Sequence, residues 1–179
     1  LGFKKKIMYS QNEEERYILE YFKDFKGRFL DIGAWDGQTF SNTFALVNKG
    51  WSGVCIEPSP TCFGALINTH NGNGLIQCVN AALSTKKELI EFYDSNGDAL
   101  STTSLVHAKK WAQVNFKKFW INTITVDDII NAFGGNFEMI SLDVEGTNIE
   151  LLKTLPLENC KLICIEYDYN TEAVMDYCK

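Results

Sequence analysis

Four acidic residues of this chain follow apolar runs, at positions where a carboxylate can do chemistry. Asp31 and Glu57 each end such a run, and Asp143 and Glu145 follow a third. A carboxylate there can accept hydrogen bonds from a ligand or take a proton as a general base. We expect Asp143 or Glu145 to be that base. The two could also hold a divalent cation, but a third oxygen ligand is not evident, so no metal is expected.

A glycine turn, Gly33-Ala34-Trp35-Asp36-Gly37, comes directly after the first apolar run. A strand, a turn and a helix in this order place a small ligand against backbone N–H groups at the carboxyl edge of a parallel sheet. The dinucleotide fingerprint has a second glycine where this chain has Trp35. A bulky indole excludes a pyrophosphate but not a nucleoside. The predicted cofactor is therefore S-adenosylmethionine, which carries no phosphate, and the predicted enzyme is a methyltransferase.

Further contacts to this cofactor follow from the spacing. Glu57 lies 24 residues after Gly33, where an acid at the end of the neighbouring strand can accept hydrogen bonds from both ribose hydroxyls. Asp31 would hold the ligand's ammonium group, and the small residues after the third strand leave room for adenine. The residues predicted to contact the cofactor are Asp31, Gly33, Ala34, Trp35, Gly37, Glu57, Pro58, Ala81 and Asp143.

The elements that must position these residues alternate in type. Strands are predicted at 28–32, 53–57 and 75–79. A helix after Gly37 would carry Phe40, Phe44 and Val47 on one face, and Ser59 with Pro60 would open the next helix. This order predicts a Rossmann-like α/β fold, a mostly parallel twisted sheet with helices on both faces.

The rest of the chain adds elements on either side of this unit. An N-terminal helix is predicted within residues 10–27, opened by Ser10 and Glu13 as a capping box and carrying apolar residues from Tyr17 to Phe25. Extended segments at 89–93 and 119–125 enclose a polar stretch, 94–118, which is the candidate lid and acceptor-selecting segment and includes a short helix at 108–116. Strands at 137–143 and 161–167 and helices after Thr125, Thr147 and Thr171 complete the chain.

Composition bounds the class of protein. The 179 residues, 45% of them hydrophobic, suit a single domain over 1–179, and the net charge of -6 makes nucleic acid an unexpected partner. No run is long and apolar enough to span a bilayer. Six cysteines form no Cys-x-x-Cys, which disfavours zinc; buried thiols, Cys55, Cys78 and Cys164 among them, and a cytoplasmic location are expected. The missing initiator Met suggests a fragment or a processed form.

The chain resembles the FkbM-type S-adenosylmethionine-dependent methyltransferases. The motifs that carry the resemblance are Ser10-Gln11-Asn12-Glu13 and residues 30–37, 41–43, 50–60, 80–83, 123–127 and 141–146. The resemblance implies cofactor contacts at the glycine turn and Glu57, and O-methylation of a small-molecule acceptor, often a sugar or a polyketide-like product. Two departures stand out: Ser141 replaces a lysine common in the family, and few residues remain for the antiparallel strands that usually follow the fifth.

Three other functions stay open at this point. A nicotinamide-dependent oxidoreductase is disfavoured by Trp35. A module that binds the cofactor without turnover is compatible with the missing lysine and the short C-terminal part. A purely structural α/β domain would leave Glu57 without a ligand. The oligomeric state does not follow from the sequence.

Overall fold

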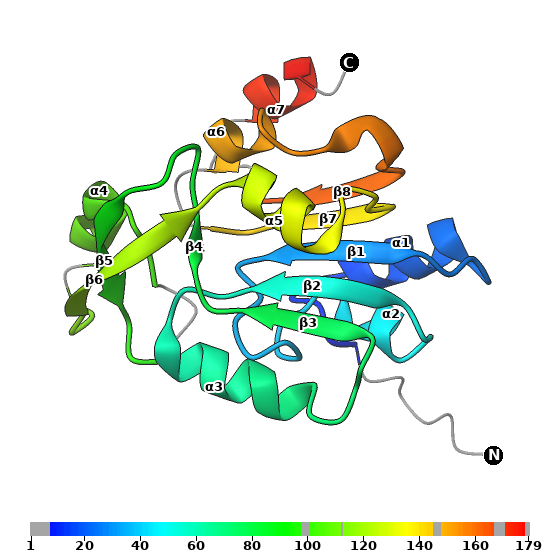
Figure 1. The fold of residues 1–179 in the computed structure, drawn as a ribbon, viewed down its shortest axis with the longest axis horizontal. Helices are drawn as coiled ribbons and strands as arrows, with labels where there is room; N and C mark the ends of the chain where they lie inside the picture. Colours follow the sequence, from blue (N-terminus) through cyan, green and yellow to red (C-terminus); the bar gives the residue numbers. More distant parts are fainter. Residues whose placement is uncertain (1–7, 98–100, 112, 145–147, 167–170, 178–179) are drawn as a thin grey trace.

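The computed structural model describes residues 8–97, 101–111, 113–144, 148–166 and 171–177. Five parallel strands form the central sheet in the order β3-β2-β1-β7-β8 (Figure 1). Their bounds are Ile76–Val79, Ser52–Ile56, Arg28–Ile32, Met139–Leu142 and Leu162–Ile165. The predicted α/β class with a parallel sheet is confirmed. β1 lies between β2 and β7, so the chain adds β2 and β3 on one side of β1 and later adds β7 and β8 on its other side. Parallel sheets bind ligands at such a switch point.

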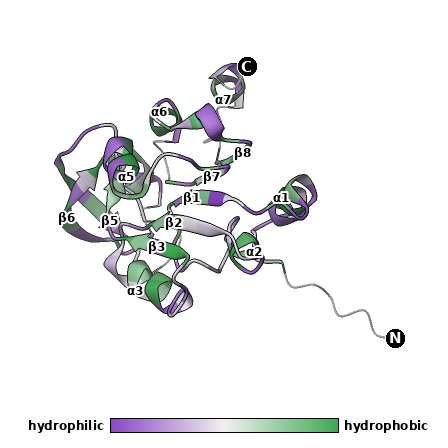
Figure 2. Cartoon of the chain, turned by 45° about the vertical axis from the view of Figure 1, so that its right-hand side comes forward, coloured by the Kyte–Doolittle hydropathy of each residue, from purple (hydrophilic) through white to green (hydrophobic). Residues whose placement is uncertain are grey.

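Two hydrophobic clusters cover the two faces of this sheet. Side chains alternate along a strand, so Leu30 and Ile32 of β1 join one cluster and Phe29 joins the other. The first cluster includes residues of α5, α6 and α7, at Val126–Phe133, Asn148–Leu152 and Thr171–Tyr177. The second includes residues of α1, α2 and α3, at Glu14–Phe22, Phe44–Val47 and Pro60–Thr69. Hydrophobic and hydrophilic residues lie side by side around α1, α3 and α5, as expected for helices on a sheet (Figure 2).

A smaller sheet stands beside the carboxyl ends of β2 and β3 (Figure 1). It has the order β4-β6-β5, from Ala82–Leu83, Lys117–Ile124 and Leu89–Asp94, and β5 pairs antiparallel with β6. The two extended segments predicted around the polar stretch are thereby confirmed. The helix within this stretch is α4, Leu105–Lys110, so it begins three residues earlier, and ends six residues earlier, than the helix predicted at 108–116. A 3-10 turn, η1, at Leu157–Asn159 leads into β8.

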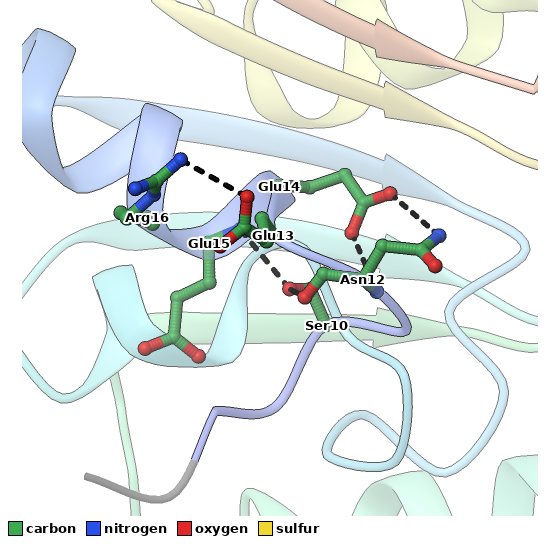
Figure 3. A network of polar contacts seen from close by, with 6 residues as sticks. All are labelled: Ser10, Asn12, Glu13, Glu14, Glu15 and Arg16. Atoms are coloured by element: carbon green, nitrogen blue, oxygen red, sulfur yellow. Dashed lines mark hydrogen bonds and ion pairs between the residues drawn. The ribbon is translucent and has the colours of Figure 1, made fainter.

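The N-terminal capping box is not formed. Ser10 accepts a hydrogen bond at Oγ from the backbone N–H of Glu15 at 3.0 Å, two residues beyond the predicted partner. Glu14 accepts from the backbone N–H and the side-chain amide of Asn12, and Glu13 pairs with Arg16 at the surface (Figure 3). The sequence signature therefore correctly predicts a helix start here, but the predicted hydrogen bonds between Ser10 and Glu13 are wrong.

The first helix is also shorter than predicted. It ends at Phe22, because Lys23 takes a positive φ of 50° that no helix continues through, and Gly27 lies beyond it. Its buried apolar residues are Ile18 and Phe22, whereas Tyr17 and Tyr21 are more than half exposed. In α3, Leu66 is fully buried whereas Ile67 is exposed.

The helix predicted after Gly37 begins later than expected and does not include Phe40. Phe40 takes a positive φ of 54° and is 52% exposed, and the helix that follows, α2, begins only at Phe44. The N–H groups of Gln38 and Thr39 donate to the carboxylate of Asp36 instead. Two other predicted helix starts are confirmed: Ser59 caps α3 with Pro60 at its first position, and Thr125 forms a capping box with Asp128.

Two further observations bear on the composition-based expectations. None of the described helices is long and apolar enough to cross a membrane. The five cysteines in the described ranges are free thiols; Cys55 is buried, while Cys78 and Cys164 are half-buried, so the expectation of full burial holds for the first alone.

Candidate functional site

A cavity opens where the carboxyl ends of β1, β2 and β7 meet the small sheet. Its wall contains three of the four acids singled out from the sequence: Asp31, Glu57 and Asp143. The rest of the described lining is apolar or uncharged and contains no lysine, arginine or histidine. The other lining residues are Ile32, Gly33, Ala34, Trp35, Thr39, Phe40, Ser41, Asn42, Ile56, Pro58, Cys62, Ala81, Ala82, Leu83, Phe92, Ser101, Thr102, Thr103, Ser141 and Val144.

The glycine turn closes tightly against the end of β7. Gly33 has a φ of +83°, and a Cβ atom there would lie 1.8 Å from the carbonyl oxygen of Asp143. The N–H groups of Gly33 and Ala34 both donate to the carbonyl of Ile56, at 3.0 Å each. The turn is thus tied to β2 on one side and touches the β7 end on the other. Only glycine fits at position 33.

Glu57 ties the turn to the strand beside it. The residue is 6% exposed, and its carboxylate accepts hydrogen bonds from the N–H groups of Trp35, at 2.9 Å, and Ser59, at 2.7 Å. Asn80 donates to the backbone carbonyl of Glu57 at 2.7 Å. Burial raises the pKa of Glu57 to about 7, although the hydrogen bonds from the two N–H donors favour the ionised form and lower it. A carboxylate held by two donors on one side keeps lone pairs for a ligand on the other.

Asp31 is a second buried carboxylate. The residue is 4% exposed, and its Oδ2 accepts from the hydroxyl of Thr43 at 2.6 Å. Ser41 prepares Thr43 for this contact, since its Oγ accepts from the N–H groups of Thr43 and Phe44. Burial raises the pKa of Asp31 to about 6, although the hydroxyls of Thr43 and Ser141 favour its ionised form. Asp31 therefore stays charged at neutral pH at a cost to the fold.

That cost predicts a stabilising substitution. Folding raises the pKa of Asp31 from 3.8 to about 6, so the folded protein loses stability as the pH increases from 4 to 6. Above pH 6 the loss stays constant. We expect Asp31→Asn to unfold at the same free energy as the wild type near pH 4, and to be more stable by up to about 3 kcal/mol at pH 7. Urea unfolding of both proteins, without ligand, between pH 4 and 8 measures this difference. A constant difference across this range would contradict the buried charge.

An aromatic pair and a hydroxyl-bearing segment complete the cavity. The rings of Trp35 and Phe40 lie 5.8 Å apart, and both residues take a positive φ. The Trp35 indole N–H donates to the carbonyl of Gly97 at 3.1 Å, which joins the glycine turn to the end of β5. On the same side, residues 101–103 contribute Ser101, Thr102 and Thr103 to the wall. The first part of the predicted lid segment 94–118 therefore reaches the cavity, through residues 101–103.

The structure gathers most of the residues predicted to contact the cofactor. Asp31, Gly33, Ala34, Trp35, Glu57, Pro58, Ala81 and Asp143 all line the cavity. Gly37 does not line it: its φ is +77°, and the position of its missing Cβ faces Leu66 and His70. Glu145 and the start of the helix predicted at Thr147 lie outside the described residues, so their predicted roles stay predictions.

Three polar residues of the site were given no functional role from the sequence, although Asn42 and Thr43 belong to a motif that carries the family resemblance. Thr43 holds Asp31, Asn42 donates to the hydroxyl of Ser141 at 3.4 Å, and Asp94 is a buried acid at the end of β5. For Asp94 a signal was present, since it ends an apolar run, as Asp31 and Glu57 do. The segment 41–43 was hidden by the helical spacing of Phe40, Phe44 and Val47.

Comparisons with known proteins give one match. The model of the methyltransferase FkbM domain matches residues 31–177, which is most of the chain and includes all of the cavity lining. No curated protein and no solved structure matches significantly.

Proposed function

The chain belongs to the methyltransferase FkbM family, and we propose that it transfers a methyl group from S-adenosylmethionine to a hydroxyl of a small molecule such as a sugar or a polyketide-like product. The observation that carries this proposal is the buried Glu57 beside the glycine turn, at the carboxyl end of β2. A ribose diol is the ligand group that such a carboxylate holds in this topology. We further propose that residues 1–179 form one such domain.

The donor set fits this cofactor. Besides its own carboxylate, S-adenosylmethionine carries an ammonium group, a ribose diol and a sulfonium, and for these three the cavity offers the carboxylates of Asp31, Glu57 and Asp143. Asp31 would hold the ammonium group, and Glu57 the ribose hydroxyls. When bound, the cofactor supplies an electrophilic methyl group on its sulfonium. The small side chains of Ala81 and Ala82 would face the adenine.

A nicotinamide cofactor fits less well. Its pyrophosphate carries two negative charges, which the carboxylates of Asp31, Glu57 and Asp143 would repel. The N–H groups that could bind a phosphate at the turn are engaged elsewhere, since Gly33 and Ala34 donate to Ile56 and Trp35 donates to Glu57. An oxidoreductase is therefore the weaker alternative.

The acceptor would enter on the side of residues 101–103. Asp143 lines the cavity and is exposed, so its carboxylate can reach an acceptor hydroxyl and take its proton. The Trp35–Phe40 pair offers an apolar platform, and the hydroxyl of Thr103 offers hydrogen bonds. Platform and hydroxyl together suit a neutral polyhydroxyl molecule better than a nucleic acid or a lipid surface. Segment 94–118 would then select the acceptor, and Glu145 would be a second candidate for the base.

Free thiols in the described ranges are compatible with the reducing cytoplasm, which we propose as the compartment. The acidic composition does not favour a nucleic-acid partner.

Binding and turnover tests separate these functions. Calorimetry should show S-adenosylhomocysteine bound at micromolar concentrations and NAD not bound. Tight NAD binding without S-adenosylhomocysteine binding would overturn the cofactor assignment. Incubation with methyl-labelled S-adenosylmethionine and a panel of sugars and polyols should then transfer label to a hydroxyl. Binding without transfer to any acceptor would favour a module that holds the cofactor without turnover.

A further inference from the structure

One buried acid near the cavity has no part in the proposed chemistry. Asp94 ends β5 and is 2% exposed. None of the ion pairs between described residues includes it. Its Oδ1 accepts hydrogen bonds from two hydroxyls, that of Ser59 at 2.9 Å and that of Ser101 at 3.2 Å. A buried carboxylate is costly unless such contacts compensate it, so its two partners indicate what it does.

The first partner connects Asp94 to Glu57. Ser59 is fully buried; its hydroxyl donates to Asp94, and its backbone N–H donates to Oε1 of Glu57 at 2.7 Å. The same hydroxyl accepts from the N–H of Cys62 as the cap of α3. Ser59 thus holds the acids of two different sheets at fixed positions.

The second partner connects Asp94 to the other wall of the cavity. Ser101 lines the cavity, accepts from the N–H of Ser95 at 3.0 Å and donates to Asp94. Thr102, next in the chain, pairs with Tyr93 through two backbone hydrogen bonds of 2.9 and 3.0 Å. Residues 101–103 are therefore held by hydrogen bonds to the end of β5, where Asp94 lies.

We propose that Asp94 is a positioning residue: through Ser59 it fixes the carboxylate of Glu57, and through Ser101 it holds residues 101–103 against the cavity. One side chain would thereby couple the cofactor side of the site to the acceptor side. The inference rests on the proposed function for the identity of the ligand, but the coupling of Asp94 to Glu57 can be measured without any ligand.

The charge of Asp94 gives this coupling a signature. The charged groups that influence Glu57 are Asp94 of β5 and Asp31 of β1, and Glu57 in turn helps to raise the pKa of the Cys62 thiol of α3. Burial is the main cause of the raised pKa of Glu57, and the negative charges of Asp94 and Asp31 raise it further. Asparagine at position 94 keeps an oxygen for Ser59 and Ser101 but removes one charge. Asp94→Asn should therefore lower the pKa of Glu57 while leaving its position unchanged.

The experiment compares Asp94→Asn and Asp94→Ala with an exposed control, Asp24→Asn, in the full chain. Carboxyl-carbon NMR of the ligand-free proteins should show Glu57 titrating at lower pH in Asp94→Asn and unchanged in the control. Calorimetry with S-adenosylhomocysteine at pH 8 should show affinity close to wild type for Asp94→Asn and about tenfold weaker for Asp94→Ala. An unchanged Glu57 titration in Asp94→Asn would overturn the proposal, as would wild-type affinity in a folded Asp94→Ala protein.

A second variant keeps the test decisive if Asp94→Ala fails to fold. Ser59→Ala removes the hydroxyl link to Asp94 and leaves the backbone N–H that holds Glu57. It should weaken S-adenosylhomocysteine binding by several-fold, and wild-type affinity would count against the proposal. A wild-type chain that binds no S-adenosylhomocysteine would overturn the cofactor assignment instead, while the NMR comparison would still decide the coupling.

Discussion

Replacing Glu57 by alanine should weaken the binding of S-adenosylhomocysteine by about 100-fold or more. The substitution removes the acceptor for the N–H groups of Trp35 and Ser59 together with the proposed partner of the ribose hydroxyls. Charge-assisted hydrogen bonds of this kind contribute about 1.5–3 kcal/mol each, and the two buried N–H groups would lose their partner. The turn that carries Trp35 would then no longer be held at the cavity wall.

Glutamine at the same position separates charge from geometry. Glu57→Gln keeps the size of the side chain, but its amide nitrogen must face either the N–H of Trp35 or that of Ser59, so donor would oppose donor. We expect a loss of about tenfold, smaller than that of alanine. Glu20→Gln, at an exposed site on α1, is the matched control and should leave affinity unchanged. Calorimetry at pH 8 gives all three values, and near wild-type affinity for Glu57→Ala would remove Glu57 from the site.

The position of these acids followed from the sequence because it depends on local patterns. Apolar runs that end in an acid predict strands that bring the acid to the carboxyl edge of the sheet. This holds for Asp31, the second-last residue of β1, and for Glu57, which directly follows β2. The parallel order followed from the alternation of strand and helix patterns. Both inferences use neighbours in the chain, which sequence spacing describes well.

The contacts between distant segments did not follow. Asp94 contacts Ser59, 35 residues earlier in the chain, only because the small sheet packs beside β2. No spacing rule predicts that packing. For the segment after Gly37, the sequence pattern predicted a helix that begins too early. Phe40, Phe44 and Val47 have helical spacing, but the Ser41 hydroxyl accepts from the N–H groups of Thr43 and Phe44, and the helix begins only at Phe44. Side chains that compete with the backbone in this way favour turns over helices.

Gly33→Ala should be the most damaging single substitution at the site. Its Cβ would lie 1.8 Å from the carbonyl oxygen of Asp143, which is backbone and cannot rotate away, and the φ of +83° is strained for any other residue. Either the turn or the end of β7 must move, and both line the cavity. We expect a loss of about 4 kcal/mol or more, a fall of roughly 8–16 °C in Tm, and no detectable S-adenosylhomocysteine binding.

Two other glycines separate the steric clash from the backbone strain. Gly72 has a φ of +78° with nothing within 4 Å of its missing Cβ, so Gly72→Ala carries the strain alone and should cost about 1–2 kcal/mol. Gly64 lies inside α3, also in open space, and Gly64→Ala should stabilise the protein by about 0.5–1 kcal/mol because alanine is the better helix former. Thermal and urea unfolding rank the three variants. If Gly33→Ala lost no more stability than Gly72→Ala, the close approach of the turn to β7, and with it the shape of the cavity, would be wrong.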